Sequence, residues 1–157
     1  MKSKAVLTGL LLLLVFTSFS FKCDSGGGGG GGDQFRGAAK AADDIAISLK
    51  KMTELRHTLA QQGTITKEQD KALIDLLLKA VNSDKLFVKA IRAAKNAPDA
   101  STKGNLCTLF TNLKSALDDL NNTGLLPVTN PSAKTQLTSI FTTIIGLVPA
   151  ITGALQC

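Results

Sequence analysis

Apolar residues recur at intervals of three and four positions in four successive segments of this chain. The first segment carries Ala42, Ile45, Leu49, Met52, Leu55 and Leu59. This interval places apolar side chains on one face of an α-helix, and no alternating pattern typical of strands competes with it. The pattern predicts helices over residues 34–62, 66–95, 102–121 and 131–155. Because short turns join these segments, we expect an all-α fold, a four-helix bundle with up-down-up-down topology.

Residues typical of helix ends lie at the predicted boundaries. Gly63 and Gly124 are expected to end the first and third helices, since glycine is the usual residue after the last helical turn. Side chains that begin helices precede three of the segments: Thr66 with Gln69 in a capping-box pattern, Ser101 or Thr102, and Asn130 followed by Pro131. The boundary residues therefore agree with the periodicity.

The second segment contains a polar group, Asn82-Ser83-Asp84, which can break a helix or begin a new one. Polar positions keep one helical phase on both sides of this group. We therefore expect one continuous helix that ends where Pro98 interrupts the backbone hydrogen bonds.

The fourth segment carries no charge after Lys134. Such a tail resembles a GPI-attachment signal if the source is eukaryotic, and it is also compatible with a membrane span. Its longest stretch without polar residues, 144–151, is far shorter than the roughly 20 residues of a span. The amphipathic interval also persists, so a buried helix of the bundle is the preferred interpretation, bent at Gly146 and Pro149.

The first 22 residues have the order of charges and apolar residues that is typical of an export signal. Lys2 and Lys4 precede an almost entirely apolar stretch over residues 5–21. Cys23 follows after Lys22, and a run of seven glycines lies within a flexible segment over residues 23–33. We therefore divide the chain into a signal peptide (1–22), a Gly-rich tether (23–33) and a helical domain (34–157).

Residues 1–33 resemble the N-terminus of a bacterial lipoprotein, in which the cysteine after the apolar stretch carries the lipid. This resemblance implies that Cys23 is the lipid attachment site and that the domain is held at a membrane. One position departs from the pattern, because Lys22 stands where lipoprotein signals have a small residue. Cleavage after Ser20, which would release a soluble exported protein, and an uncleaved membrane anchor remain the alternatives.

The remaining cysteines can pair with each other. Exported proteins tend to have paired thiols, and setting Cys23 aside for lipid leaves Cys107 and Cys157 as a possible disulfide. In an up-down-up-down bundle the end of the fourth helix returns toward the start of the third, which favours this pair. The alternative is a buried, unpaired Cys107 and a free thiol at Cys157.

Composition and charge exclude several classes of function. The net charge of +6 falls to +3 when residues 1–22 are removed, because three of the 18 basic residues lie there. Lys85, Lys89, Arg92 and Lys95 form a basic surface stripe on the second helix, but the chain has no Trp or Tyr for base stacking, so we expect no nucleic-acid partner. His57 is the only histidine, and no motif of metal or nucleophilic catalysis is present. We expect no enzyme activity, no cofactor and no metal.

The favoured function is therefore that of a non-enzymatic, exported cell-envelope protein. It would be anchored through Cys23 or secreted, and it would act as a scaffold or protein-interaction module with an envelope protein as partner. One alternative is a bundle that binds an apolar ligand in its core or in a groove beside the fourth helix. Another is a membrane-active protein that inserts its apolar last helix.

Overall fold

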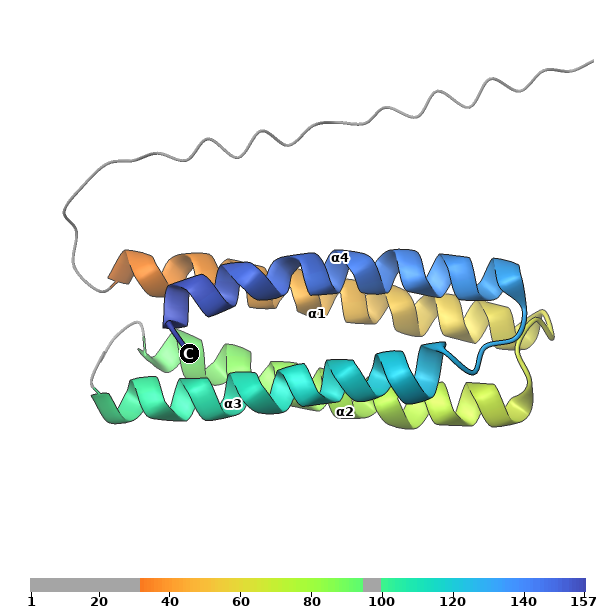
Figure 1. Cartoon of the computed structure of the whole chain (residues 1–157), viewed down its shortest axis with the longest axis horizontal. Coiled ribbons are helices and arrows are strands. Elements are labelled where there is room, and N and C mark those ends of the chain that lie inside the picture. The colour runs from red at the N-terminus through yellow and green to blue at the C-terminus, as the bar shows by residue number, and fades with distance from the viewer. Residues whose placement is uncertain (1–31, 95–99) are drawn as a thin grey trace, which may run out of the picture.

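The protein folds as an antiparallel four-helix bundle (Figure 1). The computed structural model describes residues 32–94 and 100–157, and these residues contain no strand. The helices are α1 (Gly32–Gln61), α2 (Lys67–Ala94), α3 (Ala100–Asp119) and α4 (Pro131–Leu155), with a short π-helix, η1 (Leu120–Leu125), directly after α3. Successive helices run in opposite directions, so the predicted up-down-up-down bundle is confirmed.

Several predicted boundaries are confirmed by hydrogen bonds. The backbone N–H of Thr66 donates to the Gln69 side chain (3.0 Å) and that of Gln69 donates to the Thr66 hydroxyl (3.2 Å), which completes the capping box. Gly63 has a φ of 63° in the turn after α1, a conformation that glycine adopts without strain. The Asn130 side chain accepts a hydrogen bond from the Ala133 backbone N–H (3.0 Å) at the start of α4.

The capping role of Asn130 at the start of α4 can be tested by substitution. Replacing Asn130 with alanine should lower the free energy of unfolding by about 1 kcal/mol, because one N–H of the first turn loses its acceptor. Urea unfolding followed by circular dichroism measures the change. An Asn122→Ala variant is the matched control, since Asn122 is exposed and caps no helix. Equal stability of the two variants would contradict the capping role.

The third helix differs from its prediction at both ends. α3 begins at Ala100, so Ser101 and Thr102 lie inside its first turn and do not precede it. At the other end the chain continues as η1 through Gly124, which therefore does not end the helix as predicted. A Cβ atom on Gly124 would lie 3.1 Å from Leu76 Cδ1, so glycine here allows η1 to approach α2 closely. The wider π-turn, which the apolar spacing does not signal, accommodates this approach.

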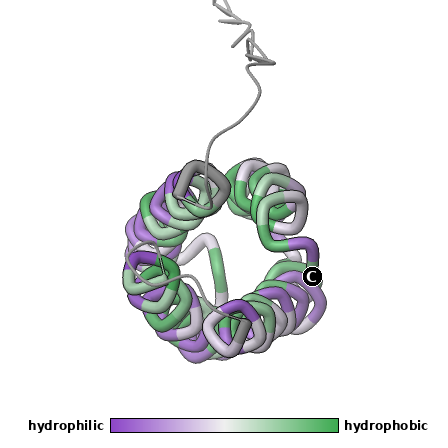
Figure 2. The backbone as a smooth tube through the Cα atoms, turned by 90° about the vertical axis from the view of Figure 1, so that its left-hand side faces the viewer, coloured by the Kyte–Doolittle hydropathy of each residue, from purple (hydrophilic) through white to green (hydrophobic). Residues whose placement is uncertain are grey.

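Helix α2 runs without interruption through residues 82–84, as predicted. Its apolar seam and those of the other helices form one core. The end-on view in Figure 2 shows the helices arranged as a ring. Phe87 of α2 and Phe110 of α3 are both buried in the core, with ring centroids 5.6 Å apart. α1 packs against both α2 and α4, and α2 packs against α3, whereas α3 and α4 make the least extensive contact of the neighbouring helices.

Helix α4 buries only one of its faces. Length and composition alone would allow this helix to cross a membrane, with a mean hydropathy of 1.7 over its most apolar window. In the bundle its apolar seam, which includes Leu137, Phe141 and Ile144, is buried and α4 packs mainly on α1. α4 is therefore an amphipathic helix of the bundle, as the persistent apolar interval predicted, and its outer face stays exposed. It continues as one helix through Gly146 and Pro149.

The predicted signal peptide (1–22), Cys23 and the Gly-rich tether up to residue 31 lie outside the described residues. So does Lys95. Helix α1 begins at Gly32, two residues before the predicted start of the domain at residue 34.

Candidate functional site

A pocket of about 260 Å³ opens between α1 and α2. It combines apolar walls with a small set of charged groups, which is the usual composition of a ligand site. The residues that line it are Asp43, Ala46 and Leu49 of α1 and Val81, Asp84, Lys85, Val88 and Arg92 of α2. The packing of α1 against α2 thus leaves one concave surface that carries carboxylates.

Asp84 is the unusual residue of this pocket. It lies on the buried seam of α2, four residues after Ala80 and three before Phe87, and its relative exposure is 2%. Its Oδ1 atom is buried and has no hydrogen-bond partner in the structure. Buried polar atoms are nearly always paired, because an unpaired one loses its water without compensation.

The environment of Asp84 favours the protonated carboxyl. Burial and, to a smaller extent, the negative charge of Asp43 together raise the pKa of Asp84 to about 7. At neutral pH the side chain is therefore divided between the neutral and the charged form. Such a group can gain or lose a proton when its surroundings change.

An ion pair crosses the rim of the pocket. Arg92 of α2 donates to Asp43 of α1 over 2.7 Å, and both side chains are partly exposed. This contact ties the two helices together at one end of the pocket. Asp43 thus has an ion-pair partner, whereas Asp84 has none among the described residues.

The ion pair between Arg92 and Asp43 alters the predicted basic stripe, because one of its cations is no longer free. Lys85 and Lys89 are exposed on α2, as expected, but Arg92 is bound to Asp43. Lys95 lies outside the described residues. Lys85 and Arg92 border the pocket, so the stripe forms part of its rim and is not a row of free cations.

A second depression of about 250 Å³ adjoins the first along the same helix pair. Val81 lines both, and apolar side chains of α2, including Ile74 and Leu78, continue the surface. Arg56 closes this part by an ion pair with Asp70 (2.6 Å). The groove between α1 and α2 is therefore apolar over several turns, with Asp84 as its buried, unpaired carboxylate.

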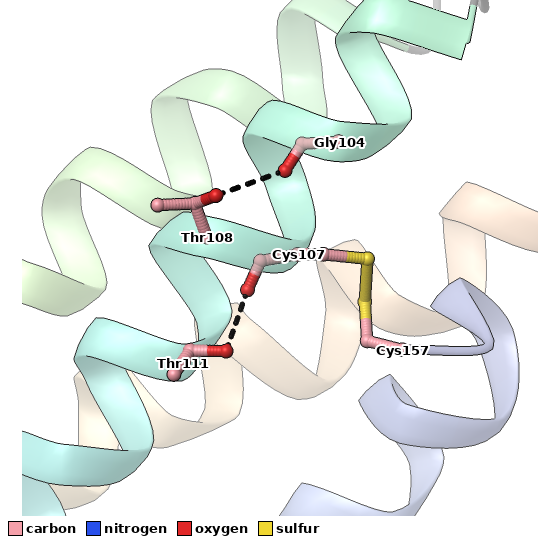
Figure 3. Close-up of a disulfide and its surroundings, with 5 residues drawn as sticks. All are labelled: Gly104, Cys107, Thr108, Thr111 and Cys157. Carbon is pink, nitrogen blue, oxygen red and sulfur yellow. Dashed lines mark hydrogen bonds between the residues drawn. A yellow bond between two sulfur atoms is a disulfide. The ribbon is translucent and has the colours of Figure 1, made fainter.

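The structure contains a disulfide between Cys107 and Cys157, the pair considered in the sequence analysis (Figure 3). The Cα atoms are 5.6 Å apart, within the usual range for a disulfide. The bond joins the C-terminal residue of the chain to α3. It therefore holds α4 to α3 on the side of the bundle where helix packing contributes least. A small groove of about 150 Å³ lies between these helices, with Leu117 and Val148 in its walls.

No group of three or more metal-binding side chains lies together in the described part of the chain. His57 is exposed on α1 and its Nε2 lies 3.0 Å from the Gln61 side-chain nitrogen. The lipid attachment proposed for Cys23 involves a residue outside the described ranges.

Asp84 is not among the site residues that the sequence predicts, because the Asn82-Ser83-Asp84 group is also typical of a helix break or cap. The spacing of apolar residues in the sequence nevertheless indicates that position 84 is unusual. Position 84 continues the buried spacing of four and three residues from Leu77 through Ala80 to Phe87, so an aspartate there falls among core positions. A charged residue at a core position of an otherwise regular seam is an indication of function.

No protein-family model matches this chain, and no significant match is found among curated protein sequences or solved structures.

Proposed function

We propose that this chain is an exported, non-catalytic helical-bundle protein that acts by binding a small, largely apolar ligand between α1 and α2. The observation that carries the proposal is Asp84, a residue in the lining of an apolar pocket whose buried Oδ1 has no hydrogen-bond partner. The pocket lies away from α4, so the ligand groove differs from the one expected beside the fourth helix.

Asp84 places a carboxyl among the core positions of α2. Replacing a buried charged group with an apolar residue of similar size often stabilises a protein. A leucine at position 84 would continue the seam formed by Leu77, Ala80 and Phe87 without an unpaired oxygen. An aspartate here costs stability in the empty bundle, and a ligand that pairs with Oδ1 would offset this cost.

The disulfide supports a location outside the cytoplasm. Disulfides persist in oxidising compartments and are rare in the cytosol of most organisms. Cys107–Cys157 therefore agrees with export by the signal proposed for residues 1–22, with either a lipid on Cys23 or a soluble product.

Binding can be tested on protein purified from the cells that produce it. Native mass spectrometry should detect a retained small molecule on the unmodified chain. Ala46→Leu should abolish its retention, because a larger side chain fills the pocket from α1. Ala93→Leu is the matched control, since Ala93 is exposed on α2 and does not line the pocket. No bound molecule, or equal retention by both variants, would overturn the assignment of the pocket.

Export is tested separately by the mature N-terminus and the thiols. Intact mass of the protein from the envelope or the medium should show loss of the first 20 or 22 residues, with acyl mass if Cys23 is lipidated. Alkylation without reductant should leave Cys107 and Cys157 unmodified. Cytoplasmic protein that begins at Met1 and has both thiols alkylated would refute export.

The outer face of α4 favours a second candidate, the docking of an envelope protein. After Lys134 the exposed positions of α4 carry no charge. Thr135, Thr142 and Thr143 donate their hydroxyls to carbonyls of their own helix, four residues earlier. Such a face is inexpensive to desolvate, and interface cores are depleted of charge. A photo-crosslinker at Ser139 should then yield a discrete adduct in the producing cell, whereas one at Lys71 on α2 should not.

A further inference from the structure

We infer that the ligand of the α1–α2 pocket is a small organic amine, with its ammonium group on Asp84 and a short hydrocarbon body along the apolar walls. This inference rests on the proposed binding function and specifies its ligand. It is drawn from the unpaired oxygen of Asp84, the charges around it and the apolar side chains that share the cavity.

The head group follows from the hydrogen-bonding capacity of a carboxylate. An ionised carboxylate only accepts hydrogen bonds, so its partner must be a donor. An ammonium group carries three N–H donors and a positive charge, whereas an alcohol offers one donor and no charge. Hydrogen bonds between ionised groups are roughly twice as strong as neutral ones. An ammonium is therefore the partner that best compensates the buried Oδ1 of Asp84.

The neighbouring charges are compatible with a cationic head. Three charged side chains line the pocket beside Asp84: Asp43 from α1, and Lys85 and Arg92 from α2. Arg92 is paired with Asp43, and the negative charge of Asp43 still acts on Asp84. Lys85 is exposed, and water screens its charge. A ligand carboxylate, in contrast, would meet Asp84 directly and require that it stay protonated.

The apolar side chains that line the pocket indicate an apolar body for the ligand. Ala46 and Leu49 of α1 face Val81 and Val88 of α2 across the cavity, and none of these side chains can form a hydrogen bond. The volume of about 260 Å³ lies just below the range for drug-sized ligands. An unbranched chain of a few carbons therefore suits the pocket better than a large ring system.

Binding of an amine should be coupled to the proton of Asp84. The pKa of Asp84 is about 7 in the free protein, whereas simple alkylamines keep their charge well above this pH. Below the pKa of Asp84 a proton must leave for the ammonium to bind. The affinity should therefore fall by about tenfold for each pH unit below 7 and level off above it.

The experiment adds one of three matched probes, n-pentylammonium, n-pentanol or n-pentanoate, to the full domain. Methyl NMR of the pocket valines and leucine reports whether the probe binds. The ammonium probe should shift the methyl signals of Val81, Val88 and Leu49. The alcohol should bind about tenfold more weakly or worse, and the carboxylate should not bind. Asp84→Asn should lower the affinity for the ammonium about tenfold to a hundredfold, while Asp118→Asn, an exposed carboxylate on α3, should leave it unchanged.

The outcomes separate the ligand class from the binding function. If the alcohol binds as tightly as the ammonium, the pocket takes apolar molecules without preference for an amine, and the inference fails while the proposed function stands. If no probe shifts the pocket methyl signals, both fail. If Asp84→Asn does not fold, Ala46→Leu serves as the second variant. It leaves the carboxyl in place and should still abolish binding by filling the cavity.

Discussion

Replacing both Cys107 and Cys157 with alanine should lower the free energy of unfolding by about 4 kcal/mol. The bond closes a loop with a sequence separation of 50 residues. Opening it gives the unfolded chain back the corresponding conformational entropy, which the chain-entropy relation places at about 4 kcal/mol. Urea unfolding under oxidising conditions measures the difference between the two proteins.

The same bond should also control the local stability of the C-terminal end. α3 and α4 pack least against each other, so removal of the covalent link leaves the end of α4 held mainly by its packing on α1. Amide hydrogen exchange at Ile151 and Leu155 should accelerate more than exchange at Leu137, near the other end of α4. Reduced wild-type protein is the control and should match the double variant. A stability loss below about 1 kcal/mol would contradict the structural role of the bond.

The second large effect concerns Asp84 and pH. Its pKa is about 7 in the folded protein and about 3.8 in a solvated chain, so the folded state holds this proton more tightly than the unfolded state does. The stabilisation that results is fully present below about pH 4 and is lost as the pH rises to 7. The difference amounts to at most about 4 kcal/mol, from three pKa units at 1.36 kcal/mol each.

An Asp84→Asn variant removes this titration. Relative to wild type, it should gain stability steadily between about pH 4 and pH 7 and keep a constant difference above that range. Urea unfolding of both proteins across this range provides the comparison. Glu68, whose pKa is lowered by its hydrogen bonds, contributes the opposite trend to both proteins and cancels in the difference. Parallel stability curves for the two proteins would show that Asp84 is solvated.

The helices could be predicted from the sequence because each depends on local features. The spacing of apolar residues identifies all four, and the Thr66–Gln69 and Asn130 caps act within one turn of the chain. The π-turn at η1 was not predictable in the same way. It depends on the close approach of Gly124 to Leu73 and Leu76 of α2, a contact between residues distant in the chain.

The candidate site also depends on contacts between residues that are distant in the chain. That Asp84 continues a buried seam is visible in the sequence, but the cavity beside it depends on how α1 lies against α2. Arg92 was assigned to a free basic stripe, since its partner Asp43 is 49 positions away and only the bundle brings the two together. Residue types and spacing therefore identified the faces of the helices, whereas pairings between helices required the structure.

The most direct test of the pocket is the titration of Asp84 followed by the NMR signal of its carboxyl carbon, with and without saturating n-pentylammonium. In the free protein the midpoint should lie near pH 7. With the amine bound it should move down by about one unit or more, because a positive charge against the carboxylate favours the ionised form. A free midpoint near the ordinary value of 3.8, or a midpoint that the amine leaves unchanged, would contradict a binding site built on Asp84.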